Sequence, residues 1–242
     1  MSELSRPAAV CLLSGGMDSA VTLAQASRDG FDTYALTFRY GQRHSVELES
    51  AQCVARALGA REHRIVDINL GALGGSSLTD AIEVPKDREL SSQASGVPAT
   101  YVPARNTVFL AVALGWAEVL GARDLYIGVN QVDYSGYPDC RPEFLEAFER
   151  LAALATAAGT ERGVRFKVHA PLLHESKREI VLHAEALGVD LGLTHTCYDP
   201  LMATDGVWAC GRCDACQLRL KGFADAGRRD PIRYANVGAT KS

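Results

Sequence analysis

Short apolar runs alternate with amphipathic stretches along the first part of the chain. The apolar run at Ala8–Leu13 has the length of a buried strand, and the stretch Asp18–Asp29 carries apolar residues at helical spacing. The alternation repeats, which predicts strands at 32–38 and 62–68 and a helix at Ser45–Leu58. Because parallel strands need long crossovers, we expect an α/β fold with an open, mostly parallel sheet and helices on both faces.

The second half of the chain continues this pattern after a long polar stretch. From Asn69 to Val102 the sequence is too long and too rich in Gly, Ser and Pro for a plain connector, so we expect a loop that covers the substrate or contacts a second subunit. Composition changes after His195, which predicts a main domain over residues 1–190 and a C-terminal segment over residues 191–242. The pattern predicts further helices at Thr107–Leu120, Pro142–Ala158, Ser176–Leu187 and Asp214–Ala226, and strands at Leu125–Val129 and Phe166–Val168.

Composition and charge are those of an ordinary globular domain. The chain has 242 residues, of which 47% are hydrophobic and 22% are charged, and its formal net charge is -4. Since nucleic-acid binding depends on clustered Lys and Arg, an acidic chain argues against a nucleic-acid partner. No apolar run reaches the ~18 residues of a membrane-spanning helix and no export signal is evident, so we expect no membrane partner and a cytoplasmic location.

The turn between the first predicted strand and helix reads LLSGGMDSAVT. A helix N-terminus offers free backbone N–H groups to an anion, and a glycine pair lets the backbone approach closely. The hydroxyls of Ser14 and Ser19 can donate to phosphate oxygens, and Asp18 can reach a Mg²⁺ ion that offsets the polyphosphate charge. A Walker A loop, a dinucleotide fingerprint and a hydrolase elbow each need residues that are missing here. The turn therefore suits a pyrophosphate group, with a plain glycine turn capped by Ser and Asp as the alternative.

Five other polar residues lie at the ends of predicted elements. Asp133 and Asp139 follow a predicted strand, where open α/β sheets bind ligands, and a carboxylate there suits the N–H edge of a purine-like ring. Arg105 and Asn106 precede an apolar helix at its anion-favouring end, where they can contact adenine or phosphate. Lys177 opens another helix, where a cation gains nothing from the dipole and so favours a phosphate partner. Helix caps, a solvated loop and an exposed surface remain the alternatives for these positions.

Four of the seven cysteines lie in one segment, at Cys197, Cys210, Cys213 and Cys216. A tight cluster in a chain with an odd number of cysteines favours a metal over a disulfide framework. Four thiolates complete a tetrahedral zinc site and leave no open position, so this zinc has a structural role. An iron–sulfur cluster is the competing ligand, and the absence of Pro after the last cysteine counts against it. Four thiols without a ligand are the other alternative.

The motif SGGMDS at Ser14–Ser19 resembles the PP-loop of the N-type ATP pyrophosphatases, which adenylate a carboxylate, carbonyl or amide oxygen. This resemblance implies that Asp18 and Lys177 serve the pyrophosphate leaving group, and that Arg105 and Asn106 contact ATP. It also implies that ATP is bound by the stretch Leu13, Ser14, Gly15, Gly16, Met17, Asp18, Ser19, Ala20, Val21, Thr22 and Leu23.

Four longer stretches narrow the resemblance: FRYGQRH, YVPARNTVFLAVALGWAE, GVNQVDYSGYPDCRPEF and CGRCDACQLRLKGF. Together they resemble the QueC family of queuosine and deazapurine biosynthesis, from Ala8 to about Tyr234. The pair before Cys197 departs from the family pattern, because His195 and Thr196 stand where Trp-Ser or a similar pair is expected.

The resemblance to the QueC family implies an ATP-dependent ligase that converts 7-carboxy-7-deazaguanine and free ammonia to 7-cyano-7-deazaguanine. One ATP would activate the carboxylate and a second the amide oxygen, with Mg²⁺ at Asp18. Asp133 and Asp139 would bind the substrate, His44 would form part of the ATP-site wall, and the four cysteines would hold one zinc per chain. We also expect a homodimer.

Two other classes of function fit the residues. A PP-loop tRNA-modifying enzyme, or another adenylating amidoligase, would share the loop, but the former is expected to carry a basic surface or an RNA-binding domain. A zinc-stabilised nucleotide-binding module without catalysis would bind ATP and form no AMP.

Overall fold

A five-stranded parallel sheet forms the centre of the computed structural model, which describes residues 6–42, 45–80, 82–88, 97–130 and 137–235. Every neighbouring pair of strands is parallel, which confirms the predicted fold class. The order across the sheet is β3 (Glu62–Asp67), β2 (Asp32–Arg39), β1 (Ala8–Leu12), β4 (Asp124–Tyr126) and β5 (Lys167–His169).

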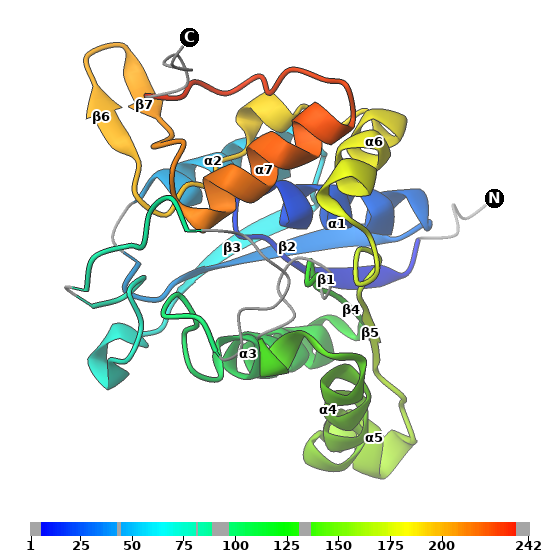
Figure 1. The fold of residues 1–242 in the computed structure, drawn as a ribbon. Coiled ribbons are helices and arrows are strands. Elements are labelled where there is room, and N and C mark those ends of the chain that lie inside the picture. The colour runs from blue at the N-terminus through cyan, green and yellow to red at the C-terminus, as the bar shows by residue number, and fades with distance from the viewer. Residues whose placement is uncertain (1–5, 43–44, 81, 89–96, 131–136, 236–242) are drawn as a thin grey trace, which may run out of the picture.

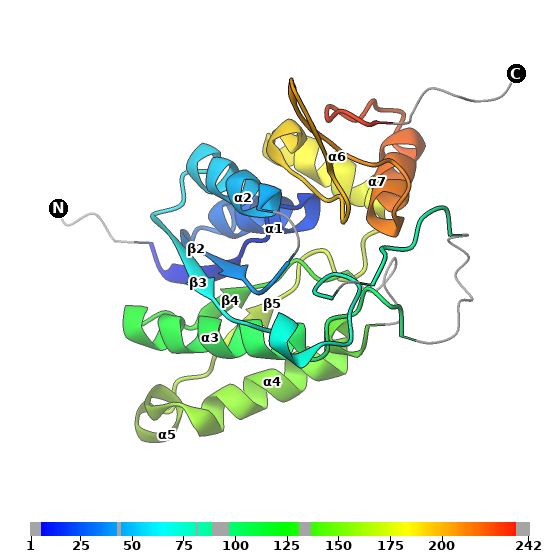
Figure 2. The same cartoon turned by 90° about the vertical axis from the view of Figure 1, so that its left-hand side faces the viewer.

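Helices cover both faces of this sheet (Figures 1 and 2). One face carries α1 (Met17–Arg28), α2 (Val46–Ala57), α6 (Lys177–Leu187) and α7 (Asp214–Asp225). The other carries α3 (Arg105–Leu120), α4 (Pro142–Ala155) and α5 (Ala157–Arg162). The largest apolar core lies on this second face, where Val10 and Leu125 of the sheet pack with Leu110 and Trp116 of α3. Among the described residues, no helix is long and apolar enough to cross a membrane.

The single helix expected at Pro142–Ala158 is wrong, because the chain breaks at Thr156 and turns back. Thr156 has extended backbone angles, and its hydroxyl accepts a hydrogen bond from the Gly159 amide at 3.0 Å, which caps α5. A Cβ at position 159 would lie 2.3 Å from the Ala153 carbonyl oxygen, so the reversal requires glycine there.

Two segments differ from the expected pattern near the carboxyl edge of the sheet. The strand expected at Leu125–Val129 ends at Tyr126, although the Ile127 amide still donates to the His169 carbonyl of β5 at 2.9 Å. A short hairpin of β6 (Leu201–Ala203) and β7 (Gly206–Trp208) was not expected. Short 3-10 helices complete the described elements: η1 (Gly71–Leu73), η2 (Pro138–Cys140) and η3 (Leu191–Leu193).

Part of the long polar stretch between Asn69 and Val102 packs against the cysteine segment. Lys86 forms an isolated β-bridge with Cys213, and the Asp87 amide donates to the Arg212 carbonyl at 2.9 Å. Val84 is buried against the four cysteines. This part of the stretch is therefore held by the C-terminal segment, while its expected roles in covering substrate or in dimer contact stay predictions.

A buried ion pair holds the C-terminal segment together. The Arg219 guanidinium lies 2.7 Å from the Asp230 carboxylate, and the two side chains are only 1% and 3% exposed. Arg219 also donates to the hydroxyls of Thr194 and Thr196 and to the Leu191 carbonyl. The Arg219 side chain thus joins α7 to the strip 191–196, which precedes Cys197. The domain boundary expected at residue 190 stays a prediction.

We predict that Asp230→Ala lowers the free energy of unfolding by about 3–5 kcal/mol, because it leaves a buried guanidinium without its carboxylate. The matched control is Asp225→Ala, which removes an exposed partner of Lys221 and should cost at most about 1 kcal/mol. Urea unfolding of both variants measures the difference. Equal losses would contradict the structural role of the Arg219–Asp230 pair.

Candidate functional site

A cavity of about 200 Å³ opens beyond the carboxyl ends of β1, β2 and β4. The strand order reverses between β1 and β4, and open α/β sheets bind their ligands at this switch point. Its polar lining includes Ser14, Asp18, Glu47, Arg105, Asn106 and Asn130.

The predicted phosphate loop lies on one wall of the cavity and depends on Gly15. This residue has φ of +86°, and a Cβ there would lie 2.3 Å from the Glu47 carbonyl oxygen, so α2 can approach the loop only because position 15 has no side chain. The N-cap of α1 is Gly16, and no side chain caps this helix. The first-turn N–H groups of α1 therefore provide the anion-favouring end that the sequence predicts.

Asp18 and Lys177 form an ion pair across 159 positions of sequence. The Lys177 ammonium donates to Oδ2 of Asp18 at 2.8 Å. The other oxygen, Oδ1, is buried and has no hydrogen-bond partner among the described residues. A carboxylate oxygen in this state suits a hard cation, so Asp18 fits the Mg²⁺ expected beside a polyphosphate. Lys177 reaches the cavity through Asp18 and is not itself part of the lining.

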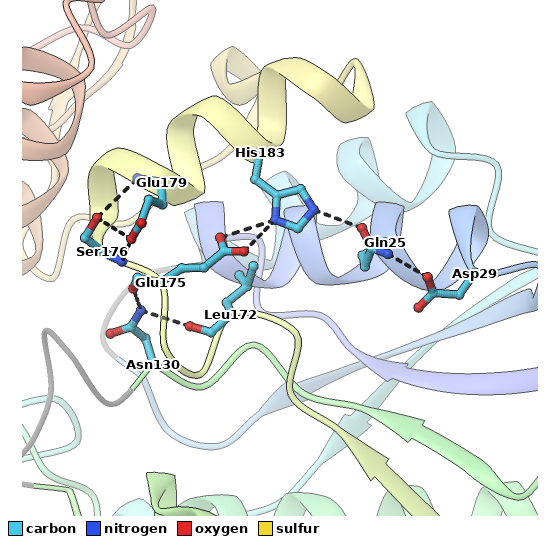
Figure 3. Close-up of polar contacts among 8 residues, drawn as sticks. All are labelled: Gln25, Asp29, Asn130, Leu172, Glu175, Ser176, Glu179 and His183. Atoms are coloured by element: carbon cyan, nitrogen blue, oxygen red, sulfur yellow. Dashed lines mark hydrogen bonds and ion pairs between the residues drawn. The ribbon is translucent and has the colours of Figure 1, made fainter.

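Two sets of hydrogen bonds fix the start of α6, where Lys177 lies (Figure 3). Asn130 follows β4, and its side-chain amide donates to the carbonyls of Leu172, at 3.1 Å, and Glu175. On α6, the His183 ring contacts the Glu175 carboxylate at 3.0 Å and the Gln25 amide oxygen of α1 at 2.9 Å. These bonds tie the start of α6 to the sheet and to the helix that carries Asp18.

Arg105 and Asn106 both line the cavity, whereas Asp139 does not. The residue before α3, Ala104, has φ of +55° and supplies no cap. Asp139 takes this role, because its carboxylate accepts a hydrogen bond from the Asn106 amide at 3.0 Å, and the Asn106 side chain donates back to the Asp139 carbonyl. This geometry matches the alternative of a helix cap. Asp133 and His44 lie outside the described residues, and the substrate role of both aspartates stays a prediction.

Apart from Gly15, which packs against α2, the predicted ATP-binding stretch divides into two groups. Leu13, Ser14, Gly16, Met17, Asp18 and Ser19 line the cavity. Ala20, Val21 and Leu23 are buried in the cores behind α1, and Thr22 is fully buried. A contact of ATP with this second group stays a prediction.

Phe38, Tyr40, Glu47 and Phe109 form a second wall of the cavity beside the phosphate loop, and the sequence pattern assigned no role to these four residues. Phe38 and Phe109 stack with ring centroids 4.0 Å apart. Burial raises the pKa of Glu47 to about 7, with Arg105 opposing the shift, and burial together with Glu47 raises the pKa of Tyr40 to about 12. An acid in the first turn of a helix is ordinary, so nothing in the pattern alone marked Glu47.

A separate candidate metal centre lies in the C-terminal segment. The sulfur atoms of Cys197, Cys210, Cys213 and Cys216 all lie within 4.8 Å of one another, and all four residues are buried. The Cys210 and Cys216 sulfurs are 3.9 Å apart, close to the ~3.8 Å edge of a tetrahedron with zinc–sulfur bonds of about 2.3 Å.

Backbone amides stabilise negative charge at this centre. The Cys210 amide donates to the Cys197 sulfur at 3.2 Å, and the Cys213 amide donates to the Cys210 sulfur at 3.3 Å. Contacts among the four thiols lower the pKa of Cys210 and raise the pKa of Cys197 and of Cys216, so four thiolates this close together need a cation. The cluster therefore fits a metal, as predicted, and zinc is the ion that a four-thiolate set favours.

Comparison with known proteins places the chain in a family. The model of the family described as queuosine biosynthesis protein QueC matches residues 8–227. The chain belongs to the QueC family. Two curated proteins named 7-cyano-7-deazaguanine synthase, from Solidesulfovibrio magneticus and Syntrophotalea carbinolica, are each 59% identical to it. The alignments cover 93% and 94% of this QueC chain and 95% and 96% of the two relatives. The solved structure of NMN synthetase from Francisella tularensis is 16% identical, with a TM-score of 0.45 over 80% of this chain and 66% of that one.

We predict that this QueC chain, as purified, holds one zinc ion, and that Cys213→Ser lowers the zinc content severalfold, because three thiolates no longer complete the tetrahedron. Elemental mass spectrometry measures the zinc content of both proteins. The control is Cys53→Ser, which changes an exposed cysteine remote from the cluster and should leave the zinc content unchanged. Full zinc content in Cys213→Ser would contradict the four-cysteine site.

Proposed function

We propose that this chain is an ATP-dependent ligase that converts 7-carboxy-7-deazaguanine and ammonia to 7-cyano-7-deazaguanine. The observation that carries the proposal is its membership of the QueC family over residues 8–227, together with 59% identity to relatives named 7-cyano-7-deazaguanine synthase over nearly their whole length. The cavity at the carboxyl edge of the sheet adds a place for the reaction.

The reaction consists of two activations of one substrate position. A carboxylate oxygen attacks the α-phosphorus of ATP and pyrophosphate leaves; ammonia then attacks the acyl carbon, and AMP leaves to give the amide. In the second activation, the amide oxygen attacks another ATP, and loss of AMP with the two amide protons leaves the nitrile. Both activations need a site that stabilises pyrophosphate and holds an oxygen in line with the α-phosphorus.

The phosphate wall of the cavity supplies that stabilisation. The free N–H groups at the start of α1 and the hydroxyls of Ser14 and Ser19 bind the pyrophosphate oxygens. Asp18 holds Mg²⁺, which offsets phosphate charge when bound. Lys177 neutralises Asp18 in the structure, and it can turn to a phosphate oxygen when a cation takes its place. In this proposal the zinc has a structural role in the C-terminal segment. Three further expectations remain predictions from the sequence: a homodimer, the absence of a nucleic-acid partner and a cytoplasmic location.

The direct test is incubation of the purified protein with ATP, Mg²⁺, ammonium and 7-carboxy-7-deazaguanine, with bases and nucleotides followed by mass. We expect the amide and then the nitrile, with AMP and pyrophosphate formed in step. If protein that is shown to hold zinc forms neither the amide nor the nitrile, the proposed function is refuted.

We predict that Asp18→Ala and Lys177→Ala each lower kcat about 10²- to 10³-fold, because each removes charge that stabilises the leaving group. The control is Asp67→Ala, which removes an exposed carboxylate at the end of β3 and should keep kcat within about twofold. Steady-state release of pyrophosphate measures all three. Full activity of Asp18→Ala would exclude the role assigned to this carboxylate.

A further inference from the structure

The second wall of the cavity, beside the phosphate loop, carries two charged side chains that the activation chemistry does not explain. Glu47 extends from the first turn of α2, and Arg105 opens α3 on the other face of the sheet. Both are half-buried and both line the cavity. Among the described residues, no donor is recorded for the Glu47 carboxylate, and Arg105 contacts the Tyr40 hydroxyl and has no carboxylate at ion-pair distance. Two charged groups are thus directed at one cavity without a direct pair between them.

This arrangement is costly unless a ligand uses it. Burial disfavours the ionised form of Glu47, and the field of Arg105 compensates for only part of that cost. Asp18 differs, because Lys177 already neutralises it. A carboxylate also repels a polyphosphate, so Glu47 suits a donor-bearing, uncharged part of a ligand. The aromatic side chains of Phe38, Tyr40 and Phe109 on the same wall suit a flat ring.

We propose that Glu47 and Arg105 recognise the six-membered ring of the deazaguanine substrate, and that they set the specificity of the enzyme for a guanine-type ring. Along one edge this ring presents a carbonyl oxygen, a ring N–H and an exocyclic amine. The Glu47 carboxylate accepts hydrogen bonds from the ring N–H and the amine, and Arg105 donates to the carbonyl oxygen. An adenine ring presents an amine and an unprotonated nitrogen on the same edge, so it cannot complete this set. The inference rests on the proposed function, which supplies the ring. It assigns to Glu47 the role that the sequence gave to Asp133 and Asp139, and it gives Arg105 a contact with this ring in place of the contact with ATP expected from the sequence.

The test uses Glu47→Gln, which keeps the size of the side chain but replaces one acceptor by a donor. We expect the KM for 7-carboxy-7-deazaguanine to rise about 10- to 100-fold and the KM for ATP to stay within about twofold. The matched control is Glu49→Gln, which changes an exposed acid in the same turn of α2 and should leave both constants unchanged. A rise in the KM for ATP alone would mean that Glu47 contacts adenine, and unchanged constants would mean that it contacts neither; either result overturns the inference.

A second measurement needs no variant and so does not depend on the folding of Glu47→Gln. The analogue of the substrate without its exocyclic amine should bind the wild-type protein about 10-fold or more weakly by calorimetry, because one carboxylate oxygen loses its donor. In Glu47→Gln the ratio of the two dissociation constants, analogue over acid, should fall towards one. Equal binding of acid and analogue to an active wild-type enzyme refutes the inference alone, whereas a wild type that neither binds nor converts the acid refutes the proposed function together with it.

Discussion

The space on which the site depends exists because the connections after two neighbouring strands, β1 and β4, run to opposite faces of the sheet. β1 leads into α1 on one face of the sheet, whereas the chain after β4 leads to α4 on the other face (Figure 2). Because the two crossovers leave in opposite directions, neither fills the volume beyond the carboxyl ends of β1 and β4. The phosphate loop, the start of α3 and Asn130 all border this volume.

The phosphate loop is held from outside by segments far away in the sequence. The Gly15 carbonyl accepts a hydrogen bond from the His195 amide at 2.9 Å, and the backbone of α2 contacts the other side of this glycine. Arg219 bonds the hydroxyl of Thr196, which lies between His195 and the first cysteine. A metal held by the cysteine cluster would therefore act on the loop through the conformation of this strip, and so would contribute to the active site without an open coordination position.

The parts of the fold that follow from local chemistry were predictable. Apolar periodicity located all five strands of the sheet, and the glycine turn before α1 indicated the anion site. The break at Thr156 was not predictable, because it depends on α5 packing back on the Ala153 carbonyl, a contact that no local pattern encodes. Asp139 was expected to bind substrate, with a helix cap as the alternative, and the choice depends on Ala104, whose left-handed backbone leaves α3 without a cap of its own. Glu47 was missed for the opposite reason: its sequence position is that of an ordinary helix acid, and only the close approach of α2 to Gly15 brings it to the cavity.

Charged side chains are paired on the phosphate wall of the cavity and unpaired on the second wall. This difference suits the two kinds of ligand proposed here, a polyphosphate and an uncharged ring. On the phosphate wall, Asp18 and Lys177 neutralise each other, so the pair can separate to meet a cation and an anion without leaving a buried charge alone. On the second wall, Glu47 and Arg105 form no ion pair with each other. The free-energy cost of burying these two charges is offset when the donors and acceptors of a ring bind to them. Recognition on that wall is thus preorganised. Since an unmet carboxylate is costly, the proposed contacts would also reject rings with the wrong edge, which an enzyme needs if ATP and a deazaguanine acid bind in one cavity.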